Sequence, residues 1–361
     1  MSGLSILLSV LAAGALHAQP ARPQERPSTT LSNDKLELTV RITGAALTKL
    51  VLLDDAARLS PMWSGGHFLC LDGFGTPTAE ETAAGWPFHG EANRQVFEVA
   101  PANKAGAISS LKMTAKLPLA QEAVTRTMQV ADGENVVYVE TEVESLVGFD
   151  RPLSWAEHAT VGPPFLEPGK VTIDLPGKHC QVRPEKPGNL PPRLPYGKNF
   201  DWPMAPLIKG GTVNLTEVPV GEANLDLASC QIDPAREYGY VVALQREKKL
   251  VFGYIFHREQ YPWLMSWMNY TGNAQAARGM EFSTQPFDVS HRDSVDAHEM
   301  FGTPTYRWLP AKSKLRTRFL FFYAKVPSEF AAVADVVLEN GVITIKDQAG
   351  RTLVLPARLG L

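Results

Sequence analysis

Apolar and polar residues alternate along most of the chain, which is the pattern of β-strands that bury one face. In LELTVRI (36–42), every second residue is Leu, Val or Ile, and Glu, Thr and Arg fill the positions between them. NVVYVETEVES (135–145) alternates in the same way. Because successive side chains of a strand point to opposite faces, both segments predict half-buried strands. The same test predicts strands at 94–99, 111–117, 170–175, 238–244, 249–256 and 317–326.

Helical periodicity is rare by comparison. It occurs in PSEFAAVADVVLENG (327–341), where Ser328 could cap a helix and Gly341 could end it. The chain closes with GVITIKDQAGRTLVL (341–355), two alternating runs around Gly350 that predict a hairpin. Many strands, Pro- and Gly-rich connections and little helix favour an antiparallel arrangement over a parallel α/β sheet. The predicted fold class is all-β, a large antiparallel β-sandwich with very little helix.

The N-terminal 30 residues lack this alternation. Residues 1–18, MSGLSILLSVLAAGALHA, contain no Lys, Arg, Asp or Glu and are typical of a secretory signal peptide. Residues 19–30 are rich in Pro, Gln, Arg and Ser, which predicts a flexible leader. We expect one domain over 31–361 and a periplasmic or secreted protein. A membrane anchor is the minor alternative, because a span needs about 20 apolar residues.

The composition of the chain excludes some classes of binding partner. Charged residues make up 20% of the chain and its formal net charge is −3, so no basic field is available to hold nucleic acid. The three cysteines, Cys70, Cys180 and Cys230, are widely spaced without a CxxC motif, which indicates neither a zinc ribbon nor a disulfide framework. One pair could bridge in an oxidising compartment, but three buried free thiols are expected.

A proline-dense stretch between His179 and Gly211 interrupts the strand pattern. Each proline removes a backbone donor, so this stretch is not expected inside a sheet. It predicts a long ordered loop or lid, and loops of this length often carry function. A later polar cluster, SHRDSVDAHEMFG (290–302), is expected to form a loop near the site.

Three segments combine polar groups with aromatic residues. GWPFHGEANRQVFEV (85–99) places His89 in a turn before a predicted strand. LSWAEHATVGPPFLEPG (153–169) carries His158 ahead of a Pro-Pro turn, and GMEFSTQPF (279–287) carries Glu281. A lone histidine in a turn is as often solvated as functional, so spacing alone does not decide between the two interpretations.

The order of these segments resembles the aldose 1-epimerase, or galactose mutarotase-like, superfamily. HGEANRQVFEV (89–99) is similar to the His-Gly segment of galactose mutarotases and of hexose phosphate mutarotases. AEHATVGPPF (156–165) stands where those families have a second His before an aromatic residue. GMEFSTQPF resembles their late strand with the catalytic Glu, and residues 31–53 resemble their first hairpin. Together the motifs span most of the chain after the leader.

The resemblance implies a β-supersandwich with a sugar site on its concave face and cofactor-free interconversion of anomers. In that family's pattern Glu281 would be the general base at the anomeric hydroxyl, and His158 the general acid at the ring oxygen. His89 would hydrogen-bond the substrate. The chemistry itself needs such a pair, because ring opening removes one proton and adds another, and it needs no metal or nucleotide. The substrate-binding residues expected beside them are Arg94, Asn93, Trp86 and Trp263.

Tryptophans could serve as platforms on which a pyranose ring stacks. This role is expected for Trp86 and Trp263, whereas Trp63 and Trp308 are expected in the core. The expected partner is a small sugar or the end of a glycan, with no membrane contact after signal cleavage.

The sequence is also compatible with other functions. Ser283 precedes Thr284 and Gln285, where galactose mutarotases have Glu, so a tight alignment on Thr-Gln would leave a carbohydrate-binding protein without its base. A glycan hydrolase or lyase of similar fold would need a second carboxylate. A metal enzyme is disfavoured, because the chain has no HExxH motif. The candidate second carboxylates are Glu91, Glu157 and Asp201.

Overall fold

The computed structural model describes residues 27–185, 189–221, 223–271 and 276–361. The predicted signal peptide, 1–18, and most of the predicted leader, 19–30, lie outside these residues. The end of that leader is part of the fold, because β1 (Ser28–Ser32) pairs with β2 (Leu36–Arg41) and buries Leu31. The domain therefore begins before residue 31. No helix within the described ranges is long and apolar enough to cross a membrane.

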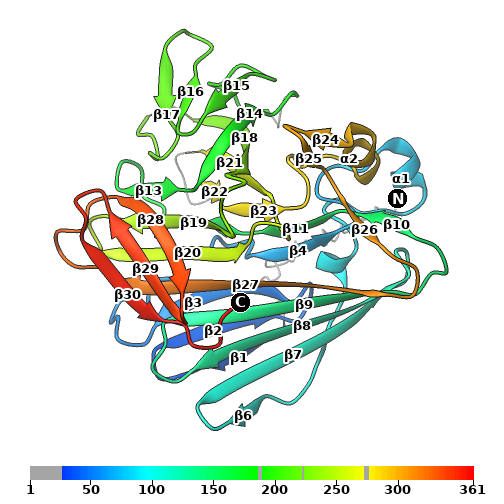
Figure 1. Cartoon of the computed structure of the whole chain (residues 1–361), viewed down its shortest axis with the longest axis horizontal. Coiled ribbons are helices and arrows are strands. Elements are labelled where there is room, and N and C mark those ends of the chain that lie inside the picture. The colour runs from blue at the N-terminus through cyan, green and yellow to red at the C-terminus, as the bar shows by residue number, and fades with distance from the viewer. Residues whose placement is uncertain (1–26, 186–188, 222, 272–275) are drawn as a thin grey trace, which may run out of the picture.

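Two large antiparallel sheets form the body of the molecule (Figure 1). The first sheet runs in the order β15 (Asn199–Asp201), β14 (Gly177–Val182), β18 (Asn224–Ile232), β21 (Trp263–Tyr270), β23 (Glu281–Ser283), β11 (Trp155–His158) and β4 (Phe68–Leu71), and β12 (Thr160–Val161) and β22 (Ala277–Gly279) pair beside this path. The second sheet runs in the order β13 (Val171–Asp174), β19 (Tyr238–Gln245), β20 (Leu250–His257), β27 (Lys314–Lys325), β9 (Val136–Ser145), β8 (Glu122–Ala131), β7 (Ile108–Leu117) and β5 (Glu98–Val99), with β6 (Asn103–Ala105) at its edge.

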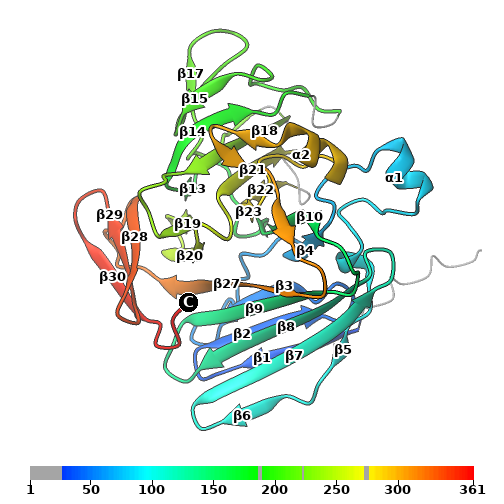
Figure 2. The same cartoon turned by 45° about the vertical axis from the view of Figure 1, so that its right-hand side comes forward.

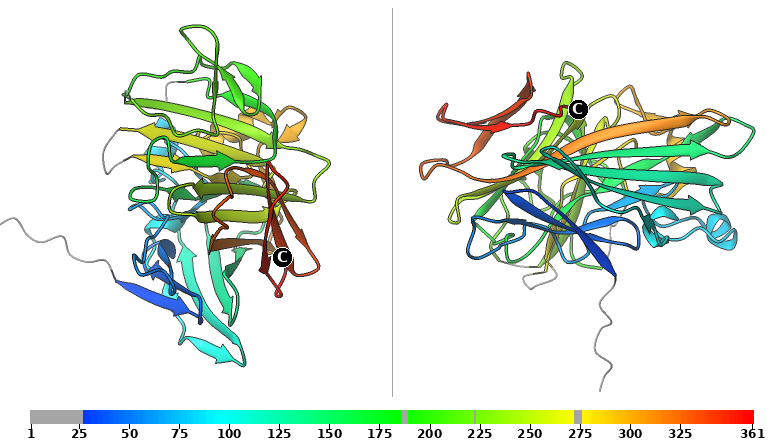
Figure 3. Two further views of the ribbon diagram at one scale, coloured as in Figure 1. Left: turned by 90° about the vertical axis from the view of Figure 1, so that its left-hand side faces the viewer. Right: turned by 90° about the horizontal axis from the view of Figure 1, so that it is seen from below.

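Smaller elements surround these two sheets (Figures 2 and 3). One three-stranded sheet joins β1, β2 and β3 (Ala46–Leu52), and another joins β28 (Val333–Glu339), β29 (Val342–Asp347) and β30 (Thr352–Pro356). Two-stranded ribbons pair β10 (Arg151–Leu153) with β26 (Arg307–Leu309), β16 (Met204–Pro206) with β17 (Thr212–Asn214), and β24 (Glu299–Met300) with β25 (Thr303–Pro304). The helical elements are α1 (Ala79–Ala83), α2 (His291–Ala297) and a 3-10 turn (Ala92–Arg94).

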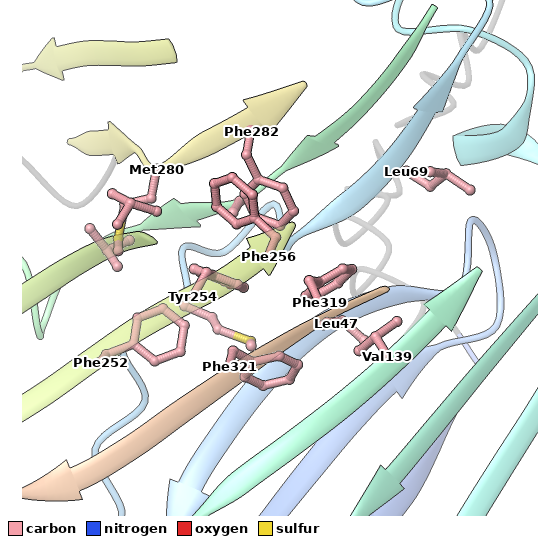
Figure 4. Close-up of a cluster of buried hydrophobic side chains, with 14 of the residues drawn as sticks. Leu47, Leu69, Val139, Phe252, Tyr254, Phe256, Met280, Phe282, Phe319 and Phe321 are labelled. Atoms are coloured by element: carbon pink, nitrogen blue, oxygen red, sulfur yellow. The ribbon is translucent and has the colours of Figure 1, made fainter. Parts of the chain in front are cut away.

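The main core lies between the two large sheets. Phe282 of the first sheet stacks on Phe256 of the second, with ring centroids 4.3 Å apart. Figure 4 shows this pair above Tyr254, Phe319 and Phe321 of the second sheet. Burying a large apolar side chain stabilises a fold by about 1.5–3 kcal/mol, so this layer holds the sheets together. The opposite face of the first sheet carries a smaller apolar cluster, and the candidate site lies there.

The predicted all-β class is confirmed by these antiparallel sheets, and so are most of the predicted strands. LELTVRI contains β2, NVVYVETEVES contains β9, and the final hairpin is β29 and β30. The segment 94–99 is strand only at its end, because Arg94 closes the 3-10 turn. The proline-dense stretch begins in β14, inside the first sheet, which differs from the expectation. Its other described residues are mostly loop with the short strands β15 and β16, and residues 186–188 lie outside the described residues.

The helix predicted at 327–341 is wrong, because that segment contains β28. Val336 and Leu338 alternate inward there and pack under the second sheet, so tertiary packing overrides the local helical pattern. The two helices that form are short and depend on their caps. Thr78 and Glu81 make a capping box at α1, and Ser290 caps α2 inside the segment expected to be a loop.

The cysteine expectation is wrong for one pair. Cys180 of β14 and Cys230 of β18 face each other across neighbouring strands and form a disulfide, whereas Cys70 is a buried free thiol. Sequence spacing could not reveal this pair, because the two cysteines are 50 residues apart.

Candidate functional site

Strand register brings His158 and Glu281 together. Ala156 of β11 pairs with Ser283 of β23, and the amide of Met280 donates to the carbonyl of Ala159 at 2.8 Å. This register sets His158 opposite Glu281 on one face of the first sheet. His158 Nε2 lies 3.9 Å from Glu281 Oε1. The two predicted reacting residues thus come from strands that are adjacent in space and distant in sequence.

The same face of the sheet forms the floor of a cavity of about 350 Å³. Met265 of β21 lies opposite Glu281, Phe68 of β4 lies opposite His158, and Trp267 of β21 also lines the cavity. Aromatic rings therefore surround the two polar groups. The lining residues are Trp63, Phe68, Phe88, His89, His158, Leu227, Met265, Trp267, Glu281 and Asp288.

His89 reaches this cavity from the turn before the 3-10 helix. It has a positive φ of 65°, and its Nδ1 donates to the carbonyl of Phe74 at 2.7 Å, which leaves Nε2 as a hydrogen-bond acceptor. Glycine is needed next, because a Cβ on Gly90 would lie 2.1 Å from the carbonyl oxygen of Leu71. Burial lowers the pKa of His89 to about 4, so its imidazole is neutral at pH 7.

His158 is held between rings. It stacks on Phe68 with centroids 4.4 Å apart and meets His89 edge-on at 4.9 Å. Its Nδ1 lies 3.2 Å from the hydroxyl of Thr160, so Nε2 is the nitrogen on the side of Glu281. Burial, followed by the neighbouring His89, lowers the pKa of His158 well below its ordinary value.

Glu281 is buried without hydrogen bonds. Its side chain has no exposed area, and neither carboxylate oxygen has a hydrogen-bond partner within the described residues. Burial first, and the nearby Asp288 second, raise the pKa of Glu281 well above its ordinary value. Burial thus favours the protonated, neutral form of Glu281, and a ligand in the cavity could supply its hydrogen bonds.

Asp288 is a cavity residue that the sequence did not single out. It lies in the loop after β23, and its Oδ1 is 2.8 Å from Nε of Arg183, a residue just beyond β14. Burial raises the pKa of Asp288 to about 6, although the Arg183 guanidinium opposes the shift. No periodicity marks this position, because a loop alone presents it to the cavity.

Four other expected binding residues are absent from the lining of this cavity. Asn93 donates to the backbone of its own turn at His89, and Arg94 is exposed beside that turn. Trp86 is half-buried against the main core. Trp263 lies on the correct face of β21, but it is fully buried and donates to the carbonyl of Pro304 at 3.1 Å.

Two tryptophans expected in the core have other environments. Trp63 lines the cavity and meets Trp267 edge to face, with centroids 5.7 Å apart. Trp308 is 59% exposed on β26. Tryptophans therefore do line the cavity, as expected, but they are Trp63 and Trp267 and not Trp86 and Trp263.

The carboxylates considered for glycan cleavage also lie outside this cavity lining. Glu157 points into the core, where it pairs with Arg126 and His67. Glu91 accepts from the backbone amides of Leu119 and Ala120. The side chain of Asp201 is 88% exposed on β15. Within the described ranges, no three His, Cys, Asp or Glu side chains are grouped as a metal site requires.

Comparison with known proteins places the fold. No protein-family model matches the chain, and no curated protein matches it in sequence. A protein from Synechocystis sp. PCC 6803 aligns with 86% of this chain and 100% of its own, at a TM-score of 0.59 and 13% identity. A galactose mutarotase-like protein from Clostridium acetobutylicum aligns with 82% of this chain and 95% of its own, at a TM-score of 0.58 and 13% identity.

A galactose mutarotase related enzyme from Lactobacillus acidophilus aligns with 84% of this chain and 99% of its own, at a TM-score of 0.57 and 11% identity. The chain has a galactose mutarotase-like fold. The resemblance noted in the sequence is thus confirmed at the level of the fold. At these identities the galactose mutarotase-like fold does not fix an activity, so function has to be argued from the cavity.

Proposed function

We propose that this protein is an aldose 1-epimerase-like isomerase that interconverts sugar anomers by acid/base ring opening. The supporting observation is that Glu281 and His158 face each other 3.9 Å apart in an aromatic-lined cavity. Opening a pyranose ring removes a proton from the anomeric hydroxyl and adds one to the ring oxygen. A carboxyl and an imidazole on one face of the cavity supply both functions.

Each polar group then has a task. Glu281 takes the proton of the anomeric hydroxyl, and His158 protonates the ring oxygen as the ring opens. Nε2 of His89 is free to accept from a sugar hydroxyl, because Nδ1 is committed to Phe74. Asp288 accepts from a further hydroxyl. The apolar face of the sugar stacks on Trp63 or Trp267, and no cofactor is needed.

The proton inventory of the pair suits this reaction. Burial raises the pKa of Glu281 and lowers that of His158, so it favours a proton on Glu281 over one on His158. The assigned roles also require one proton, but on His158. Hydrogen bonds from sugar hydroxyls to Glu281 favour its carboxylate, because bonding to the charged form lowers a carboxyl pKa. Substrate binding thereby moves the proton toward the imidazole.

Cavity size favours a single sugar ring. Ligand pockets usually enclose about 300–1,000 Å³, and this cavity of about 350 Å³ lies near the lower limit. A free hexose or the terminal unit of a glycan fits this description.

Polarimetry tests the proposal. Freshly dissolved α-glucose and α-galactose are followed with the mature protein, with Glu281→Gln, and with Glu247→Gln as the matched control, since the side chain of Glu247 is 61% exposed. We expect acceleration by the wild type and the control, and a loss of about a hundredfold or more in Glu281→Gln. Equal rates for all three proteins would contradict the role of Glu281.

Two outcomes would favour other functions. Saturable sugar binding without acceleration, in wild type and Glu281→Gln alike, would identify a noncatalytic carbohydrate-binding protein. Release of reducing ends from a polysaccharide would identify a glycan-cleaving enzyme, for which Asp288 would be the second carboxyl group in the cavity.

We further propose that residues 1–18 direct export to the periplasm or medium. The Cys180–Cys230 disulfide supports this, because disulfides persist in oxidising compartments. N-terminal sequencing of the protein purified from the exported fraction is expected to show loss of the first 18 or so residues. An intact N-terminus in a cytoplasmic protein would contradict export.

A further inference from the structure

The lining of the cavity includes two acidic side chains, of which only Asp288 has a cationic partner among the described residues. Glu281 and Asp288 line it, and among the described residues that form its walls none is Lys or Arg. Arg183 approaches from outside this lining and is engaged with Asp288 at 2.8 Å. Within the described residues Glu281 has no such ion pair with Lys or Arg, and Nε2 of His158 lies 3.9 Å from its Oε1. A ligand that brings a positive charge would balance the cavity.

The walls of the cavity suit a cation as well. Trp63, Phe68, Phe88 and Trp267 contribute four aromatic side chains to one lining. The faces of such rings carry negative electrostatic potential, which attracts ammonium groups, most strongly when the group is shielded from water. Trp63 and Trp267 meet edge to face at 5.7 Å, so they form a corner in which a small charged group is in reach of both rings.

Glu281 supplies the second, independent observation. It is fully buried, it lines the cavity, and both of its oxygens lack a hydrogen-bond partner within the described residues. A neutral sugar can offer hydroxyl donors to these oxygens, but it brings no positive charge of its own into the apolar surrounding. An ammonium group offers donors and compensates the charge together.

A neighbouring cavity of about 320 Å³ also has more acidic than basic side chains in its described lining. It lies on the other side of the loop that carries Asp288, since Phe287 and Val289 line it. Among the described residues, its charged lining side chains are Arg183, Glu185, Asp293 and Glu299, three carboxylates against one cation. The surroundings of the site therefore repel anions, which disfavours a phosphorylated sugar or a uronic acid.

We propose that the preferred ligand of this cavity is an amino sugar, a hexose with a free protonated amine. The inference rests on the proposed function for the orientation of the sugar, and it deepens that function by naming the substrate class. The ammonium group lies between the carboxyl groups and the aromatic corner. By stabilising the carboxylate of Glu281, the ligand itself prepares the base that acts on its anomeric hydroxyl.

Binding measured separately from turnover tests this. The mature protein is titrated calorimetrically with glucosamine, glucose and N-acetylglucosamine at pH 7, where most of the free amine is protonated and Asp288, with a pKa of about 6, is ionised. N-acetylglucosamine keeps the nitrogen and removes the charge. We expect glucosamine to bind roughly tenfold or more tightly than both neutral sugars. Equal or weaker binding of glucosamine would overturn the proposal, and this comparison needs no variant.

Variants of the two carboxyl groups test which of them binds the ammonium group. Asp288→Asn is expected to reduce the preference for glucosamine over glucose severalfold, whereas Asp54→Asn, whose side chain is 71% exposed, leaves the preference unchanged. An unchanged preference in both Asp288→Asn and Glu281→Gln would also overturn the proposal. Polarimetry separates the two hypotheses: acceleration of neutral sugars without tighter glucosamine binding contradicts the ligand class alone, and tight glucosamine binding without any acceleration contradicts the isomerase alone.

Discussion

Two buried pairs of a histidine and a glutamate lie among the described residues, and they behave in opposite ways. In the core, His67 Nε2 is 2.8 Å from Glu157, and Arg126 donates to both oxygens of that carboxylate at 3.1 and 2.9 Å. In the cavity, the one ion-pair partner of Glu281 among the described residues is His158, at 3.9 Å. Glu157 and His158 are consecutive in β11, so one strand contributes to both pairs through its two faces.

The difference lies in partners and not in burial. Burial opposes the ionisation of Glu157, but Arg126 and His67 together outweigh it and lower the pKa of Glu157. Burial of Glu281 meets no such compensation, so its pKa is raised. A fully bonded carboxylate is structural, whereas an unbonded one in a cavity is available to a ligand.

The largest expected effect is the loss of stability when the core pair is broken. Arg126→Met leaves the carboxylate of Glu157 buried without its main cation, and we expect the free energy of unfolding to fall by about 3–5 kcal/mol. Urea denaturation followed by circular dichroism measures it. The double variant Arg126→Met/Glu157→Leu removes both charges and is expected to recover much of the loss. A single variant as stable as wild type would contradict a structural role for the core pair.

pH dependence separates the two glutamates. Because the pKa of Glu281 is raised in the folded protein, the unfolded chain loses this proton first, and Glu281 makes stability fall as pH rises above about 4.5. Glu157 has the opposite sign: its contribution is present above about 4.5 and is lost as pH falls. Melting temperatures of Glu281→Gln are therefore expected to decline less between pH 4.5 and 7 than those of wild type. A steeper decline would contradict the assigned direction.

Asp288 gives a smaller effect of the same sign. Its folded pKa of about 6 exceeds the ordinary 3.8, so wild-type stability falls as pH rises between these values. We expect Asp288→Asn to remove about 1–2 kcal/mol of that fall, since the side chain is 23% exposed and also bonded to Arg183. Parallel pH profiles of unfolding free energy for variant and wild type would be inconsistent with this.

The smallest effect concerns the aromatic walls. Trp267→Ala is expected to weaken sugar binding by about 1–2 kcal/mol, because Trp267 lines the cavity. Trp86→Ala is expected to change binding by less than about 0.5 kcal/mol, because that side chain packs against the core. Calorimetric titration with one sugar measures both. Equal losses would mean that the bound sugar extends beyond the cavity toward Trp86.

The strands could be predicted from the sequence for a physical reason, and so could three residues that line the cavity. Alternation records which face of a strand is buried, so β2, β9 and the final hairpin could be predicted from it. His89, His158 and Glu281 lie in short motifs whose order resembles a known superfamily, and the structure gathers all three at one cavity.

What the sequence could not reveal depends on contacts between distant segments. Asp288 reaches the cavity from a loop, and Cys180 meets Cys230 only when β14 pairs with β18. Val336 and Leu338 follow a pattern that suits helix or strand, and packing on the second sheet decides the outcome. Trp263 and Trp267 share one face of β21, but Trp263 is covered at Pro304.

The most direct test of the central claim compares the two pairs in one assay. The initial rate of α-galactose mutarotation is measured by polarimetry for wild type, Glu281→Gln and His67→Gln, each verified as folded by circular dichroism. The account predicts a loss of about a hundredfold or more in Glu281→Gln and less than about threefold in His67→Gln. Equal losses in the two variants, or full activity in Glu281→Gln, would contradict the assignment of the cavity pair as the reacting one.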